Sequence, residues 1–245
     1  MNDVLLVFLY ALATAVATGF GAIPFAFVRE ISARFAAYSS AVAGGLMLGA
    51  SFGLVAEGTA YGRGETLIGA LAGVAFILGT KRLFGEHDGQ ELVFEAATGE
   101  GAKKMLLIII VMTVHSFAEG VAVGVSFGGG VTLGAVITID IAIHNIPEGV
   151  AISAVLRPQG VSVGRCAAWS VFSSLPQPLM AVPAFLFVET FRPALPYGLG
   201  FAAGAMVFMV LVELLPEAYK HGDRAQVATL ATASAVAMVL FQQWL

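Results

Sequence analysis

Charged residues are scarce in this chain of 245 residues. Only 11% of them are Asp, Glu, Lys or Arg, whereas 58% are hydrophobic and the mean hydropathy is +0.90. A soluble domain carries about 25% charged residues, so the composition excludes a soluble globule and predicts an integral membrane protein. The formal net charge is only −4, and the absence of a basic patch argues against a nucleic-acid partner.

The chain is also poor in cysteine, and it has no basic cluster at its N-terminus. Cys166 is the only cysteine, so an internal disulfide is excluded. The first apolar run follows Asp3 without a preceding lysine or arginine. A cleaved signal peptide begins with a positively charged region. We therefore expect the first apolar segment to be retained as a membrane helix.

Long apolar runs, in contrast, are plentiful. A membrane helix needs about 20 mainly apolar residues, and by this measure we expect eight transmembrane helices in one transmembrane domain, residues 1–245. The expected helices are residues 4–28, 36–57, 66–84, 105–127, 131–155, 164–188, 194–216 and 225–244. A polar, mostly acidic loop, residues 85–104, separates the third helix from the fourth.

The distribution of basic residues predicts the orientation of the chain. Ten of the twelve lysines and arginines lie in the loops after odd-numbered helices, and only Arg63 and Arg192 lie on the other side. Cytoplasmic loops of membrane proteins carry an excess of lysine and arginine. We therefore expect the loop 85–104 in the cytoplasm and both termini outside it.

Glycines recur at four-residue spacing in three of the expected helices. The rows are Gly45, Gly49 and Gly53; Gly120, Gly124 and Gly128; and Gly200 and Gly204. Small residues at this spacing let two helix backbones approach closely. They predict a tightly packed bundle.

Two copies of one polar motif lie in this apolar background. His115 and Glu119 stand four residues apart, as do His144 and Glu148, so each pair shares one face of a helix. The loop between the two expected helices is short and glycine-rich, which makes them antiparallel neighbours. The four side chains can therefore converge. Ionisable groups at membrane depth are costly and indicate a functional site.

The four side chains need a compensating positive charge. Two carboxylates in a low dielectric require a proton or a cation between them, and neither expected helix contains lysine or arginine. Imidazole and carboxylate together form a ligand set for divalent first-row metals. Two alternatives remain: interhelical hydrogen bonding, and a proton relay without metal. An intramembrane metalloprotease would need the order His-Glu-x-x-His, which neither copy has.

Further polar residues lie in the expected helices, beyond the two motifs. Asp140 lies one turn from His144 toward the outside, where we expect a metal entrance. Glu213, Glu217 and His221 repeat at four-residue spacing in the seventh helix. We expect this second group near a cytoplasmic exit, with an ordinary helix end at the membrane interface as the alternative.

At these residues the sequence resembles the ZIP (Zrt/Irt-like) family of metal transporters, and most of all its bacterial and plant branch. The resemblance rests on His115-x-x-x-Glu119-Gly120 and His144-Asn-x-Pro-Glu148-Gly149. It extends to four further segments: Gly21-Ala-Ile-Pro24, Met47-Leu-Gly-Ala-Ser51, Gly200-Phe-Ala-Ala-Gly-Ala205 and Glu213-Leu-Leu-Pro-Glu217.

The resemblance implies a fold and a function. The fold would be an all-α integral membrane protein of eight transmembrane helices in a 3+2+3 bundle, with both termini extracytoplasmic. The function would be transport of divalent metal as substrate into the cytoplasm, zinc first, with iron, cobalt, manganese and cadmium as alternatives. The partners would be the metal ion and the lipid bilayer, with a homodimer as a candidate assembly. The absence of a targeting segment and the minimal loops favour a bacterial inner membrane.

The resemblance also implies two adjacent metal positions. The first would use Met47, His115, His144 and Glu148, with Glu119 nearby. The second would use Ser116, Glu119, Asn145, Glu148 and Gln177. In well-described prokaryotic members the positions of Asn145 and Gln177 hold carboxylates, and asparagine is common at Ser116. Without two negative charges the second position should bind a divalent ion weakly. We therefore predict one well-formed site, made by the two histidines and two glutamates.

Overall fold

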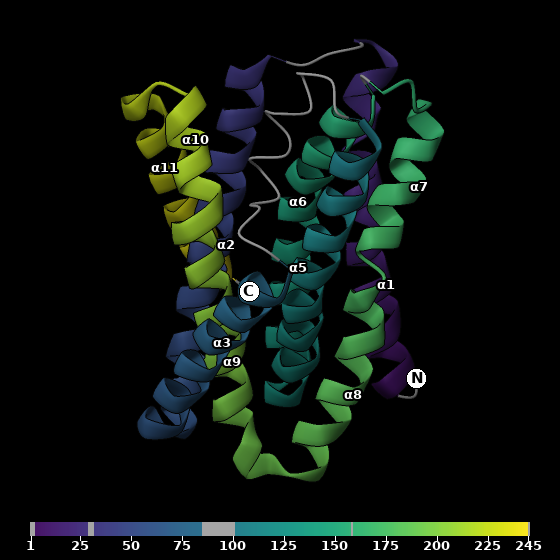
Figure 1. The fold of residues 1–245 in the computed structure, drawn as a ribbon. Helices are drawn as coiled ribbons and strands as arrows, with labels where there is room; N and C mark the ends of the chain where they lie inside the picture. Colours follow the sequence, from purple (N-terminus) through teal and green to yellow (C-terminus); the bar gives the residue numbers. More distant parts are fainter. Residues whose placement is uncertain (1–2, 29–31, 85–100, 158, 245) are drawn as a thin grey trace.

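The computed structural model describes residues 3–28, 32–84, 101–157 and 159–244 (Figure 1). Within these ranges the secondary structure is entirely helical, without a strand, which confirms the predicted all-α class. Seven described segments are long and apolar enough to cross a membrane. Most of the predicted loop 85–104 lies outside the described residues. The extracytoplasmic placement of both termini stays a prediction.

Ten α-helices make up the described chain. They are α1 (Asp3–Phe20), α2 (Ala33–Tyr61), α3 (Arg63–Phe84), α5 (Gly101–Gly129), α6 (Val131–Leu156), α7 (Val163–Ser173), α8 (Pro176–Thr190), α9 (Leu195–Met209), α10 (Leu215–His221) and α11 (Arg224–Trp244). Two short 3-10 turns, Ile23–Ala26 and Arg192–Ala194, follow α1 and α8. A π-helical segment, Val210–Leu214, joins α9 to α10.

Prolines mark most places where the helices differ from the predicted continuous spans. The span predicted at 164–188 is divided into α7 and α8, because Pro176 and Pro178 cannot donate backbone hydrogen bonds to the preceding turn. The span predicted at 194–216 contains the π-helical segment just before Pro216 and continues to His221. In contrast, α6 runs through Pro147 without a break.

The helices form two groups that lie side by side. The first group contains α1, α5, α6, α7 and α8, and the second contains α2, α3, α9, α10 and α11. Contacts of α2 with α6, and of α5 with α9, join the groups. In Figure 1 the second group lies on the left and α1, α7 and α8 on the right, with α5 and α6 between them. The spatial grouping therefore does not follow the order of the helices along the chain.

The glycine rows lie at helix crossings, as the sequence predicted. A Cβ atom built on one glycine of each row would lie 2.1 to 2.2 Å from a backbone oxygen of the facing helix: Gly45 against Ala231, Gly124 against Ala181, and Gly200 against Thr66. These distances are too short for any side chain. The rows thus allow close approach of α2 to α11, α5 to α8, and α3 to α9.

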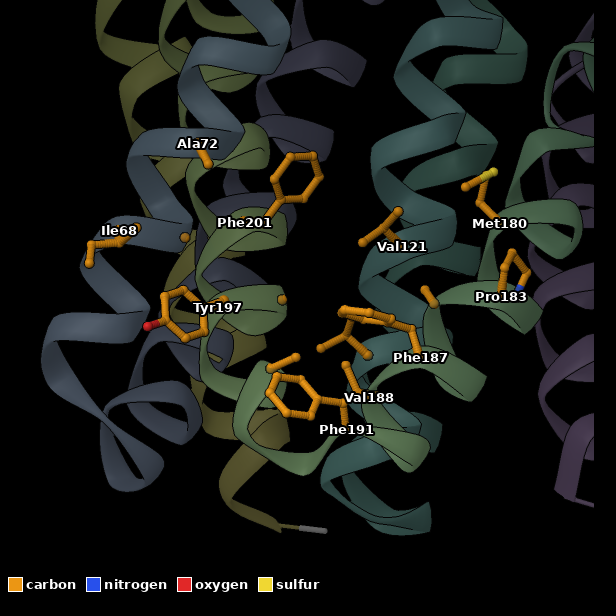
Figure 2. Close-up of a pocket in the computed structure, with 15 residues that line it drawn as sticks. Ile68, Ala72, Val121, Met180, Pro183, Phe187, Val188, Phe191, Tyr197 and Phe201 are labelled. Carbon is orange, nitrogen blue, oxygen red and sulfur yellow. The ribbon is translucent and has the colours of Figure 1, made fainter.

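An apolar cavity of about 600 Å³ lies between α3 and α9 on one side and α5 and α8 on the other (Figure 2). Val121, Phe187 and Phe201 are among the side chains that line it. None of the described residues around it carries a charge, and none belongs to the predicted metal site. The cavity therefore lies at one part of the border between the two helix groups and offers no imidazole or carboxylate to a metal.

Candidate metal centre

The four motif residues are buried in the middle of the first helix group. His115 and Glu119 lie on α5, His144 and Glu148 lie on α6, and none of the four is more than 5% exposed. The glycine turn at Gly130 reverses the chain between these helices and makes them neighbours. The predicted convergence of the two motifs is therefore present.

Three of these residues face one another closely enough to bind one metal ion. Ligand atoms of His115, Glu119 and Glu148 all lie within 4.8 Å of one another. The His115 Nε2 atom lies 3.3 Å from Glu148 Oε1 and 4.0 Å from Glu119 Oε1. Among the described residues, neither that nitrogen nor either Glu148 oxygen has a hydrogen-bond partner. Buried polar atoms are normally satisfied, so these atoms are suited to coordinating a cation.

His144 joins this cluster through Glu119. Its Nε2 atom lies 2.9 Å from Glu119 Oε1, the same oxygen that lies 4.0 Å from His115. Glu119 thus stands between the two histidines, and a metal at this point would meet imidazole nitrogens from both helices. Nitrogen and oxygen ligands of this kind suit zinc and neighbouring transition metals.

The residues of the implied second position form a hydrogen-bond network. The Gln177 side chain donates from Nε2 to Glu119 Oε2 at 2.6 Å. Its Oε1 accepts from Asn145 Nδ2 at 3.1 Å and from Thr14 Oγ1 at 2.5 Å. Asn145 Nδ2 also donates to the Thr14 backbone oxygen at 2.8 Å. The network connects α1, α5, α6 and α8.

Sequence reasoning did not identify Thr14. The available signal was a pair of polar residues, Thr14 and Thr18, four residues apart in an otherwise apolar helix. Both are fully buried, and Thr18 Oγ1 lies 2.8 Å from Ser174 Oγ at the break between α7 and α8. The polar face of α1 therefore packs on the broken helix that carries Gln177.

Two further expected ligands are buried. Met47 is fully buried on α2, which packs against α6, and its backbone oxygen accepts a hydrogen bond from Ser51 at 2.7 Å. Ser116 is 1% exposed, and its hydroxyl has no hydrogen-bond partner among the described residues. Their roles as ligands stay predictions.

The residues expected along the pathway lie on α6 and on the segment that follows α9. Asp140 is fully buried, with its Oδ2 atom 3.6 Å from His144 Nδ1. Glu213 is buried in the π-helical segment. Glu217 is also buried and contacts His221 Nε2 at 3.1 Å and Lys220 Nζ at 2.8 Å. Lys220 therefore offsets the charge of Glu217. Sequence reasoning did not include this lysine in the group.

A bundle of apolar helices with buried imidazole and carboxylate side chains is compatible with a membrane protein that transports metal ions. The family model described as "ZIP Zinc transporter" matches residues 86–240. This chain belongs to the ZIP family.

Three curated relatives are similar over most of this chain. A putative zinc transporter of Arabidopsis thaliana is 47% identical over 233 residues, which cover 94% of this chain but only 37% of that protein. The zinc transporter GufA of Myxococcus xanthus is 32% identical, with 89% of this chain and 91% of the relative covered. The zinc transporter ZIPB of Bordetella bronchiseptica is 33% identical, with 92% and 76% covered.

Proposed function

We propose that this protein carries divalent metal ions, zinc first among them, across a membrane into the cytoplasm. The observation that carries the proposal is the buried cluster of His115, Glu119 and Glu148, whose ligand atoms lie within 4.8 Å of one another. Among the described residues, His115 Nε2 and both Glu148 oxygens have no hydrogen-bond partner. A divalent cation balances the two carboxylates and avoids the cost of leaving them unpaired. Membership of the ZIP family supports the same function.

Transport requires binding that can be reversed. His115 and Glu119 on α5 would hold the ion together with His144 and Glu148 on α6, so both helices contribute ligands. Access from the two sides of the membrane would alternate by movement of the helix groups relative to one another. The mixed nitrogen and oxygen ligands favour zinc, iron, cobalt, manganese or cadmium over Mg²⁺ and Ca²⁺, which prefer oxygen alone.

The proposal includes one ion per chain. The amide of Gln177 already donates to Glu119 Oε2 and accepts from Thr14, so neutral donors fill the place where a second cation would bind. This hydrogen bonding supports a single site.

Gln177→Glu should create the second position. The substitution replaces the amide donor with a carboxylate beside Glu119 and so supplies one of the two negative charges that the position lacks. We expect zinc stoichiometry, measured by elemental analysis of purified protein, to rise from one ion per chain toward two. Gln177→Met, which adds no charge, is the matched control, and an unchanged stoichiometry in Gln177→Glu would contradict the single-site account.

The proposal also concerns enzymatic activity and location. Both motifs read His-x-x-x-Glu, so no glutamate adjoins a ligand histidine as the base of a zinc protease does. We therefore propose a transporter and no enzyme. We place it in a bacterial inner membrane; the similar zinc transporters reported above come from two bacteria and a plant.

Zinc uptake into vesicles tests the proposal. Purified protein is reconstituted, and uptake of radiolabelled zinc is compared for wild type, His144→Ala and Glu148→Ala. We expect wild-type uptake and a large loss in both variants, because each removes a ligand atom from the cluster. Equal uptake by all three would refute metal transport through this site, and proton flux without metal would favour the relay.

A further inference from the structure

His144 lies between two carboxylates, and only one of them belongs to the metal cluster. Its Nε2 atom faces Glu119 at 2.9 Å, and its Nδ1 atom faces Asp140 at 3.6 Å. Asp140 stands one helical turn before His144 on α6, so the two side chains lie on the same face of the helix. Both are fully buried.

Asp140 has no other hydrogen-bond partner among the described residues. Neither of its carboxylate oxygens is hydrogen-bonded, and neither is His144 Nδ1. A buried carboxylate without a partner is costly, and the imidazole is the ionisable group that faces it. The separation of 3.6 Å is longer than a hydrogen bond. A hydrogen bond between the two atoms requires them to approach by about 0.5 Å.

We propose that Asp140 is a positioning residue for the metal site. When zinc binds, Asp140 accepts a hydrogen bond from the His144 Nδ1–H group, which leaves the Nε2 lone pair for the metal. The metal then replaces the proton of the hydrogen bond between His144 Nε2 and Glu119 Oε1. A metal-binding histidine commonly donates its second ring N–H to a carboxylate, which fixes the ring and its tautomer. The inference rests on the proposed metal transport, and it gives Asp140 a different role from the entrance expected from sequence.

The two histidines differ in this respect. The residue one turn before His115 is Val111, whereas the residue one turn before His144 is Asp140. Only the second copy of the motif thus has a carboxylate one helical turn before its histidine. We infer that His144 is the fixed ligand and that its orientation depends on Asp140.

X-ray absorption spectroscopy of the zinc-loaded protein tests this role, with Asp140→Asn and Asp140→Leu as the variants. The asparagine side-chain oxygen can still accept from Nδ1, so Asp140→Asn should keep two imidazoles on zinc and an affinity close to wild type. Asp140→Leu, similar in size but without an acceptor, should lose one imidazole and weaken zinc binding roughly 10–100-fold. A merely structural role would not change the number of imidazoles on the metal.

A second measurement does not depend on any variant. NMR of isotope-labelled histidine in zinc-loaded wild type should show His144 with its proton on Nδ1 and its metal on Nε2. Metal on Nδ1, or an Asp140→Leu protein with two imidazoles and wild-type affinity, would overturn the inference. So would a second zinc ion that only Asp140→Leu loses, because Asp140 would then be a ligand. Wild type that binds no zinc would instead refute the proposed function itself.

Discussion

Zinc uptake should fall to the level of empty vesicles when Glu119 is replaced by alanine. Its Oε1 atom lies between the two histidines, and its Oε2 atom accepts the hydrogen bond from Gln177. The substitution removes a metal ligand and also leaves the Gln177 amide without its acceptor. The loss should exceed the roughly 10–100-fold reduction that is typical when a residue behind a metal ligand is removed.

Initial rates of radiolabelled zinc uptake check this expectation, with Glu189→Ala as the matched control. Glu189 is a half-exposed glutamate at the end of α8 that pairs with Arg192 at 2.8 Å. A surface pair of this kind contributes little to stability, so uptake should not change in the control. Wild-type uptake by Glu119→Ala would show that the ion does not pass this carboxylate.

Gly149→Ala should be the most destabilising small substitution in the bundle. A Cβ atom at Gly149 would lie 1.8 Å from the backbone oxygen of Thr18, and one at Gly21 would lie 2.2 Å from the Val150 nitrogen. The backbones of α1 and α6 therefore touch at this crossing, and no side-chain movement can relieve the clash. We expect a loss of about 3 kcal/mol or more, at the upper end for overpacking.

Thermal unfolding in detergent measures this loss, and Gly79→Ala provides the control. Gly79 lies inside α3, and a Cβ atom added there would meet no other described side chain or helix within 4 Å. Alanine there should be neutral or stabilise by up to about 1 kcal/mol, since alanine favours a helix over glycine. Equal unfolding temperatures for the two variants would mean that the α1–α6 crossing is looser than the structure indicates.

The convergence of the two His-x-x-x-Glu motifs could be predicted from the sequence because its signal is local. His115 with Glu119, and His144 with Glu148, are separated by one helical turn, and a short glycine loop joins their helices. Ionisable side chains are costly in an apolar helix, so their presence indicates a function even without knowledge of their contacts. The glycine rows were predictable for the same reason, because four-residue spacing defines a helix face.

The partners of these residues could not be predicted, because they come from distant parts of the chain. Thr14 contacts Gln177, 163 residues later, and Asn145 reaches the backbone of Thr14 across 131 residues. Hydropathy predicts that α1 exists but does not say which helices it packs against. The π-helical segment before Pro216 also escaped prediction, since a proline near a helix end is compatible with several backbone conformations.

The amide network around Gln177 has a mechanical consequence. Its hydrogen bonds join α1, α5, α6 and α8. These four helices are therefore linked to one another beside the candidate metal site. Their border with α3 and α9, in contrast, includes an apolar cavity. Sliding along this apolar part of the border exchanges one apolar contact for another, whereas separating the four hydrogen-bonded helices would break several hydrogen bonds in a low dielectric. If the network stays intact when the site opens to the other side of the membrane, α1, α5, α6 and α8 would move as one rigid body and carry the ion with them.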